Sequence, residues 1–400
     1  MVFMIRKIFI ILLTLTMLIG YGDEALCQDG FQVNAKAAVL FEFNSAQFLL
    51  EQNADEKIEP ASFTKVMTLY LAQDGLKKGA ITLDDPVTVS ENAWRTGGSQ
   101  MFIEVGKQVR LEDLLNGIAV VSGNDACVAL AEHMSGKEEA FVEQMNQKAK
   151  ELELVNTIFK NPHGLPADGQ YTSARDMALL AYHYIKEYPQ VITLHSKQTF
   201  TFNNITQANR NGLLRMNVGV DGLKTGYIEN AGYHLIATVQ REGRRLIAVV
   251  MGAKAWKERE NEALNLLNYG FRNFLLKEPV KKGEVVKTVP VKGGKYDAVE
   301  LIAQEGVVLS VSLNGKDSLK VVEDIPSQIV APVKKGEILG KVTVEAGGKQ
   351  FRQVNLLAKN EVPKGWQAYW RFGIAVLGII VVVFLMQRIL RRRKPTKGLH

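Results

Sequence analysis

The hydrophobic pattern of this chain changes character at about residue 279. Before that point, short apolar runs typical of strands are mixed with longer stretches that have the apolar spacing of helices. After it, short β-branched runs are separated by glycine and lysine. A chain of 400 residues is long enough to bury two cores. The pattern therefore predicts an α+β domain at 28–277 and a small all-β domain at 278–362.

In the first domain, strand-like segments lie near both ends and helix-like segments lie between them, so we expect the two ends to share one sheet. The expected strands are a hairpin at 37–53, an edge strand at 220–227 and the runs 233–240 and 246–252. The expected helices are 62–78, 111–154 with breaks at Ser122 and Ser135, 173–184 and 258–276.

The second domain contains a local repeat. The sequence PVKKGE at 279–284 recurs at 332–337, and an apolar strand-like run follows each copy. This predicts two related hairpin entries. The segment holds no cluster of candidate catalytic residues, so we interpret it as a stalk or spacer.

The first 27 residues have the features of a secretory signal peptide. Arg6 and Lys7 precede an uncharged apolar run at 8–21, and Ala25 and Cys27 are small residues at the cleavage site. We expect cleavage after Cys27. An uncleaved anchor and a lipoprotein are the alternatives, and Leu26 before the cysteine disfavours the second.

The other end contains an unbroken apolar run at 372–386. Aromatic residues precede it and a basic cluster follows, which predicts a transmembrane anchor at 366–390 and a basic cytoplasmic tail at 391–400. The alternative is a helix that lies in the membrane interface. Since positive charge stays in the cytoplasm, we expect a single-pass protein of the inner membrane with its catalytic domain on the periplasmic side.

Charge and cysteine content exclude other classes. The net charge is +7, and six basic residues after Gln387 account for most of it, while the acidic Asp23 and Glu24 balance the two basic residues near the start. The segment between the two ends is therefore nearly neutral, whereas a nucleic-acid-binding protein carries its basic residues on the folded domain. If Cys27 leaves with the signal peptide, Cys127 has no partner for a disulfide bond.

Metal-ligand, phosphate-binding and nucleophile-elbow motifs are missing from the sequence, and the six histidines are scattered. We therefore expect no metal and no cofactor, and lysine becomes the candidate base. Ser62-Phe63-Thr64-Lys65 is the only Ser-x-x-Lys sequence. It follows Pro60 at a predicted helix start, where unpaired N–H groups favour a developing negative charge, and it puts a serine and a lysine on one helix face.

Two further motifs accompany this pair. Lys224-Thr225-Gly226 is also unique and lies on the predicted edge strand, where Gly226 permits close approach of a ligand and Lys224 provides a second cation. Ser-x-Asn occurs at Ser90, Ser122 and Ser312. Ser122 interrupts an apolar run between helices, so we select Ser122 and Asn124.

The three motifs occur in the order Ser-x-x-Lys, Ser-x-Asn and Lys-Thr-Gly, which is the motif set of penicillin-binding proteins and serine β-lactamases. The chain resembles the low-molecular-mass penicillin-binding proteins, specifically D-alanyl-D-alanine carboxypeptidases of the penicillin-binding protein 5 type. Tyr227 departs from that family, which often has histidine there. The segments that also match are SGNDAC at 122–127, HGL at 163–165, SARD at 173–176 and NRNGL at 209–213.

The resemblance implies a β-lactamase/transpeptidase-like domain, with an antiparallel sheet and helices on both sides. It also implies roles for site residues. Ser62 is the nucleophile, Lys65 its base and Ser122 a proton relay, while Asn124 holds the substrate amide. Lys224, Thr225 and Gly226 position the peptide, and Arg259, with Arg210 as second candidate, binds the terminal carboxylate.

The substrate implied by the resemblance is the pentapeptide stem of peptidoglycan, and β-lactam antibiotics are implied as covalent inhibitors. Two other functions use the same features. A serine β-lactamase requires rapid deacylation, for which Glu151 superficially resembles the loop glutamate. A non-catalytic peptidoglycan-binding scaffold is the other alternative, and the presence of every motif residue disfavours it.

Overall fold

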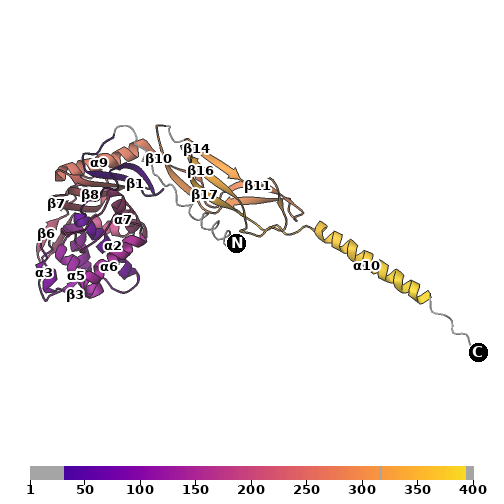
Figure 1. The fold of residues 1–400 in the computed structure, drawn as a ribbon, viewed down its shortest axis with the longest axis horizontal. Helices are drawn as coiled ribbons and strands as arrows, with labels where there is room; N and C mark the ends of the chain where they lie inside the picture. Colours follow the sequence, from indigo (N-terminus) through magenta and orange to yellow (C-terminus); the bar gives the residue numbers. More distant parts are fainter. Residues whose placement is uncertain (1–30, 315–317, 393–400) are drawn as a thin grey trace, which may run out of the picture. The chain divides into compact units, whose positions relative to one another are not determined.

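A computed structural model describes residues 31–314 and 318–392 of the chain (Figure 1). The chain divides into two compact units, with the boundary between Arg272 and Asn273. The predicted signal peptide at 1–27 and most of the predicted basic tail lie outside the described residues.

The first unit is built on a five-stranded antiparallel sheet in the order β2-β1-β9-β8-β7. β1 from the start of the unit pairs with β9 from its end, with Leu40 opposite Ala248. The predicted sharing of one sheet is therefore confirmed, and β7 is the predicted edge strand. The strands are β1 (Ala37–Glu42), β2 (Gln47–Gln52), β7 (Val220–Ile228), β8 (Gly232–Arg241) and β9 (Arg244–Ala253).

Helices cover both faces of this sheet, as predicted. Neighbouring residues of β1 point to opposite faces. The Phe41 ring lies 5.3 Å from that of Tyr182 on α7 (Ala174–Glu187), whereas Leu40 lies against Gly270 on α9 (Trp256–Asn273). A side chain at Gly270 would clash with Leu40 and Leu246, so the glycine allows α9 to approach the sheet closely.

The helical region between the strands follows the predicted breaks. A π-helix at Gly117–Val121 ends at Ser122, whose backbone is left-handed with φ of 65°. The further helices are η1 (Ala61–Phe63), α2 (Thr64–Lys77), α3 (Glu91–Arg95), α4 (Leu111–Asn116), α5 (Asn124–Ser135), α6 (Glu138–Glu151), α8 (Val191–His195) and η3 (Gly212–Arg215). β3 (Pro86–Thr88) and β4 (Gln108–Arg110) form an antiparallel pair on either side of α3, and β5 (Thr199–Phe202) and β6 (Ile205–Ala208) form a hairpin.

The second unit contains a small all-β domain, as predicted, with a six-stranded sheet in the order β14-β16-β17-β12-β11-β15 and a separate pair of β10 with β13. Its strands are β10 (Phe274–Val280), β11 (Val285–Lys292), β12 (Ala298–Ala303), β13 (Val307–Ser312), β14 (Leu319–Asp324), β15 (Ile329–Val330), β16 (Ile338–Ala346) and β17 (Lys349–Ala358).

The two copies of the repeat form the same turn. Gly283 donates its N–H to the Ala303 carbonyl, and Gly336 donates to that of Ala358. The φ angles of these glycines are 76° and 80°, in the left-handed region that glycine adopts without strain. β11 follows the first turn and β16 the second, so the repeated sequence does begin two related hairpins.

The end of α9 differs from the sequence-based expectation. We predicted a helix as far as residue 276, but α9 ends at Asn273 and β10 begins at Phe274. Phe274, Leu275 and Leu276 pair with β13 in register with Ser312, Val311 and Ser310. Pairing with a strand more than thirty residues later, a contact that local sequence does not reveal, ends the helix.

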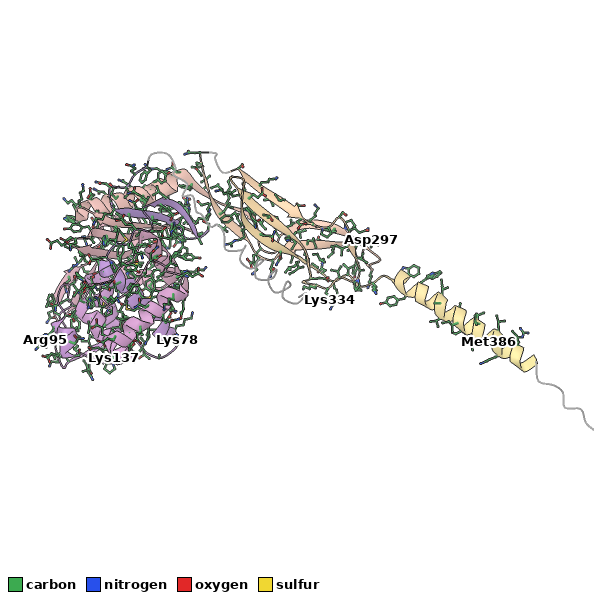
Figure 2. The ribbon with its side chains drawn as sticks, viewed as in Figure 1. Lys78, Arg95, Lys137, Asp297, Lys334 and Met386 are labelled. Carbon is green, nitrogen blue, oxygen red and sulfur yellow. The ribbon has the colours of Figure 1, made fainter. Side chains whose placement is uncertain are left out.

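A helix, α10 (Trp366–Arg392), occupies the position of the predicted membrane anchor. The described apolar side chains of this helix are exposed, and Met386, labelled in Figure 2, is 60% exposed. Within the described residues, however, no helix combines the length and the apolar character needed to cross a bilayer. The predicted transmembrane span is therefore not supported, although the predicted helix is present.

Candidate active site

Ser62 and Lys65 meet at the start of α2. Ser62 lies in the short helix η1, directly after Pro60, and Lys65 is in the first turn of α2. The Lys65 Nζ atom is 3.0 Å from the Ser62 Oγ atom. Lys65 is fully buried, so its ammonium has lost the solvation it would have in water.

Two further acceptors hold the Lys65 amine. Asn124 Oδ1 is 2.6 Å from Nζ, and the backbone carbonyl of His163 is the other acceptor. Burial is the main reason that the Lys65 pKa falls to about 8, and the nearby positive charge of Arg210 lowers it further. Near neutral pH a useful fraction of Lys65 is therefore the neutral amine, which can accept a proton.

Ser122 and Lys224 form a second serine–lysine pair. The left-handed conformation of Ser122 puts it at the exit of the π-helix, and the Lys224 Nζ atom is 3.0 Å from its Oγ atom. Burial, followed by the charge on Lys65, holds the Lys224 pKa well below its usual range. The other two Ser-x-Asn serines lie elsewhere, since Ser90 caps α3 and Ser312 belongs to β13.

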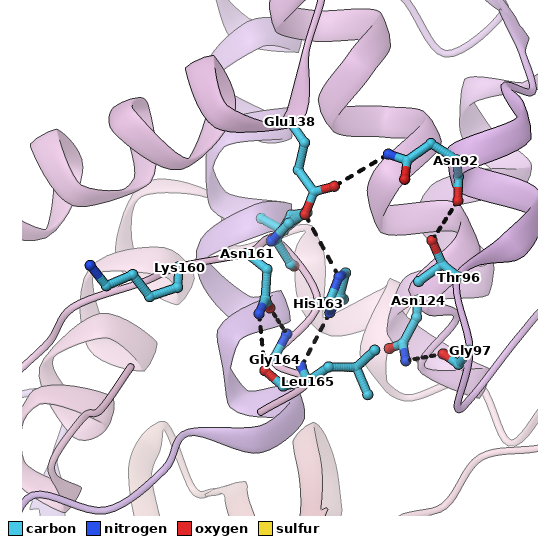
Figure 3. Close-up of polar contacts among 12 residues, drawn as sticks. Asn92, Thr96, Gly97, Asn124, Glu138, Lys160, Asn161, His163, Gly164 and Leu165 are labelled. Carbon is cyan, nitrogen blue, oxygen red and sulfur yellow. Dashed lines mark hydrogen bonds and ion pairs between the residues drawn. The ribbon is translucent and has the colours of Figure 1, made fainter. Parts of the chain in front are cut away.

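The residues after Ser122 secure one wall of the site. The Asn124 side-chain amide donates to the Gly97 carbonyl over 2.7 Å (Figure 3). The Asp125 carboxylate accepts hydrogen bonds from the backbone N–H groups of Met101 and Phe102. α5 thus begins with two side chains that hold the segment 97–102 beside the nucleophile.

A loop containing His163 and Gly164, shown in Figure 3, also lines the cleft. Gly164 has a φ of 88°, and a Cβ atom there would lie 1.8 Å from the Ala61 carbonyl oxygen. Burial, with the charge of Lys65, lowers the His163 pKa to about 3, so the ring is neutral at neutral pH. Its Nε2 atom is 3.7 Å from Glu138, but no ion pair forms with a neutral ring.

The predicted substrate-binding residues lie along β7 and the adjoining helix. Thr225 and Gly226 line the cleft, and Gly226 faces Ala61. Arg259 on α9 is 6% exposed and donates to the carbonyls of Gly226 and Arg210 over 3.3 and 3.2 Å. Its Nε atom is buried without a hydrogen-bond partner.

These residues surround a single cleft of about 680 Å³. The lining includes Ser62, Ser122, Asn124, Arg210, Thr225, Gly226 and Arg259. Lys65 and Lys224 do not line the cleft themselves, but each contacts a serine that does. All nine predicted site residues are therefore brought together. No group of three or more histidine, cysteine, aspartate or glutamate side chains in the described part of the chain is placed to hold a metal ion.

Sequence reasoning assigned no role to the backbone acceptors of this site. The carbonyls of His163 and Gly97 hold Lys65 and Asn124, and Asp125 holds the segment before Ile103. The segments that contain His163 and Asp125 resemble those of the family, and this resemblance was the only sequence feature that pointed to these two residues. Any residue can provide a carbonyl, so the Gly97 contact had no signal in the sequence.

The fold and the site, with a serine oxygen beside a buried lysine amine, together define a serine acyl-transfer hydrolase. The first unit matches the family model described as D-alanyl-D-alanine carboxypeptidase over residues 24–255. The second matches the penicillin-binding protein 5 C-terminal domain over residues 274–364.

Individual relatives agree with these matches. The chain is 42% identical to D-alanyl-D-alanine carboxypeptidase DacC of Escherichia coli over 341 residues, which cover 83% of this chain and 85% of the relative. The solved structure of penicillin-binding protein 5 from Haemophilus influenzae superposes with a TM-score of 0.75 at 40% identity, covering 84% of this chain and 99% of that one. The chain therefore belongs to the D-alanyl-D-alanine carboxypeptidase family.

A third relative was solved with an antibiotic in place. Penicillin-binding protein D2 from Listeria monocytogenes, in its ampicillin-bound form, is 30% identical with a TM-score of 0.56. The match covers 61% of this chain and all of that one.

Proposed function

We propose that this protein is a serine D-alanyl-D-alanine carboxypeptidase that removes the terminal D-alanine from the pentapeptide stem of peptidoglycan. The observation that carries the proposal is the meeting of two serine–lysine pairs, Ser62 with Lys65 and Ser122 with Lys224, at one cleft. A carboxypeptidase acting by acyl transfer needs both a base for the nucleophile and a proton source for the leaving amine.

The reaction follows from these positions. The Ser62 oxygen attacks the carbonyl carbon of the penultimate D-alanine while neutral Lys65 takes the hydroxyl proton. Backbone N–H groups of Ser62 and of a residue on β7 stabilise the oxyanion. The C–N bond then breaks as Ser122 passes a proton to the departing D-alanine amine. Water finally hydrolyses the ester and regenerates Ser62.

The cleft also offers cations for the free carboxylate of the terminal D-alanine. Arg259 is nearly buried and has an unpaired Nε atom, and Arg210 lines the same cleft. A guanidinium held away from water binds a carboxylate more strongly than an exposed one does. We assign the carboxylate to Arg259, with Arg210 as the second cation.

The test is to incubate the full-length protein with diacetyl-L-Lys-D-Ala-D-Ala and to measure the D-alanine released. Ser62→Ala should abolish this release and also abolish covalent labelling by penicillin, because the attacking oxygen is gone. Circular dichroism should show an unchanged fold, since the change opens no core cavity. Penicillin label found by mass spectrometry on the Ser62→Ala protein would overturn the assignment.

The acyl-enzyme chemistry extends to β-lactams, and we propose that penicillins acylate Ser62. A β-lactam carbonyl presents the same electrophile, but its leaving group stays attached, which slows the release of the acyl group. The β-lactamase alternative is less favoured. Glu151 lies at the end of α6, where it pairs with Lys148 over 3.3 Å, and it is not among the residues that line the cleft.

We also propose that the protein is exported and then held at the inner membrane through α10, with the catalytic unit on the periplasmic side. The basic and apolar segments at 6–21 support export. The exposed apolar side chains of α10 support contact with lipid, because such a surface is costly in water. Examples with 56–64% exposure are Ile374, Leu377, Ile379 and Ile380.

A further inference from the structure

An aromatic pair at the cleft has no part in the chemistry described above. Tyr227 on β7 lies directly opposite Tyr233 on β8, and their ring centroids are 4.4 Å apart with an angle of 33° between the planes. Both residues line the same cleft as Ser62. Tyr227 is nevertheless 53% exposed. A large ring that is left accessible inside a cleft is a surface on which a ligand can pack.

Other side chains of the site hold the two tyrosine rings in place. The Arg259 guanidinium lies 5.6 Å from the centre of the Tyr233 ring, so Tyr233 has Arg259 and Tyr227 as neighbours. Tyr227 is in turn backed by Tyr233. A ring that is already held by a neighbour loses little conformational freedom when a ligand packs against it, which favours binding.

The position of Tyr227 along β7 indicates which half of the substrate it meets. Gly226 faces Ala61, next to the nucleophile. Lys224, on one side of Gly226, contacts Ser122, the proton source for the leaving amine. Tyr227 is on the other side of Gly226, so an acyl donor that extends along β7 away from the leaving amine runs toward Tyr227.

β7 is the edge of the sheet, so an extended substrate can add to it as a further strand. Side chains of such a strand point alternately to the two faces of the sheet. One side chain of the bound substrate then lies on the face of the sheet where the Tyr227 ring is exposed. The ring offers that side chain an apolar surface and a hydroxyl group.

We propose that Tyr227, backed by Tyr233, determines specificity by binding the side chain of the acyl donor, and that it favours donors whose side chain is aromatic or long and apolar. The inference rests on the proposed function, because it requires acylation of Ser62. It adds the chemical class of donor that the cleft prefers.

The experiment compares two penicillins on the full-length protein. Benzylpenicillin has a phenylacetyl side chain, whereas 6-aminopenicillanic acid has the same reactive ring system without it. In Tyr227→Ala the second-order rate constant of Ser62 acylation should fall about tenfold for benzylpenicillin, and this loss should be at least fivefold larger than that for 6-aminopenicillanic acid. Tyr227→Phe keeps the ring and should restore most of the preference.

Tyr296→Ala is the matched control. Tyr296 is 54% exposed, close to the 53% of Tyr227, but it lies in the all-β domain, so its removal should leave the ratio of the two rate constants unchanged. Equal losses on both penicillins in Tyr227→Ala, or no loss, would overturn the specificity role while leaving the proposed function intact. A wild-type protein that neither penicillin acylates would instead overturn the proposed function, and this inference with it.

Discussion

Two opposing effects set the proton affinity of Lys65. Its amine has three oxygen acceptors, from Ser62, Asn124 and His163, and these favour the charged form. Complete burial opposes them, and it is the larger effect, since the pKa of the side chain falls to about 8. The site thus keeps the lysine close to its partners and still allows it to lose its proton.

This balance predicts the pH dependence of acylation. Only the neutral amine can take the Ser62 proton, and its population rises as the pH increases through the pKa. The second-order rate constant for penicillin should therefore rise with pH and level off above an apparent pKa of about 8. Stopped-flow acylation between pH 6 and 10 would measure it, with the range set by that pKa. A profile that falls across this range would contradict the assignment of Lys65 as base.

A substitution tests the same residue. Lys65→Arg keeps a positive charge but does not lose a proton near neutral pH, so acylation should fall by orders of magnitude. The protein should remain folded, which thermal denaturation would check. Acylation within a few-fold of the wild-type rate would show that another group is the base.

Gly164 has a conformational role next to Ser62. A Cβ atom there would overlap the Ala61 carbonyl, whereas one at Gly169, which also has a positive φ, would meet only Lys160 at 3.6 Å. Both alanine substitutions should cost about 1–2 kcal/mol for the left-handed backbone. Gly164→Ala alone should also displace the nucleophile and reduce acylation at least tenfold. Thermal denaturation and penicillin labelling would separate the two effects, and equal labelling of both variants would refute the steric role.

At the scale of elements, α9 connects the back of the sheet with the cleft. One part of it packs on β1 through Gly270, and another brings Arg259 beneath β7. The packing of α9 on the sheet therefore sets the direction of the helix, and this direction places the nearly buried Arg259 guanidinium at the site. The sequence of the helix alone does not predict this position of Arg259.

Arg259→Ala should reduce kcat/KM about a hundredfold for a peptide that ends in free D-alanine, but much less for the same peptide with an amide-capped end, because only the first presents an anion. Arg259→Lys should recover part of the loss. Arg272→Ala, an exposed arginine on the same helix, provides the control and should change neither rate. Similar losses on both peptides would show that Arg259 supports the fold of β7 instead.

The elements that sequence predicted well are those specified by local pattern. The hairpin of β1 and β2, the helix after Pro60 and the break at Ser122 all follow from apolar spacing and turn residues. The strand β10 was assigned to a helix, because its partner β13 lies far along the chain. The acceptors of His163 and Gly97 were missed for a related reason, since backbone carbonyls are brought to a site only by the tertiary fold.

At the scale of the whole molecule, charge is concentrated at one end. The chain carries a net charge of +7, most of it after Gln387, whereas residues 28–365 taken together carry no net charge. A segment without net charge has little net electrostatic attraction to anionic lipid. If the protein is held at a membrane, α10 and the basic residues around its end must provide the attachment.

Truncation tests this division of roles. A chain that ends at Gly365 lacks α10 and the basic residues after it, but retains the first unit, with every residue of the cleft, and the all-β domain. We expect it to leave the membrane fraction and to keep its kcat/KM for small D-Ala-D-Ala peptides, because these substrates diffuse freely to the cleft. Its activity on intact cell wall should fall, since attachment raises the local concentration of a wall-bound substrate.

Extraction of the full-length protein determines how α10 is attached. A helix that lies in the interface is held partly by charge, so carbonate at high pH or concentrated salt should release it, whereas a helix buried in the bilayer resists both. We expect release, because the basic residues around the end of α10 make part of its attachment dependent on charge. Retention of the truncated chain in the membrane fraction would refute the assignment of attachment to α10. Loss of its small-peptide activity would refute the independence of the catalytic unit from the C-terminal helix.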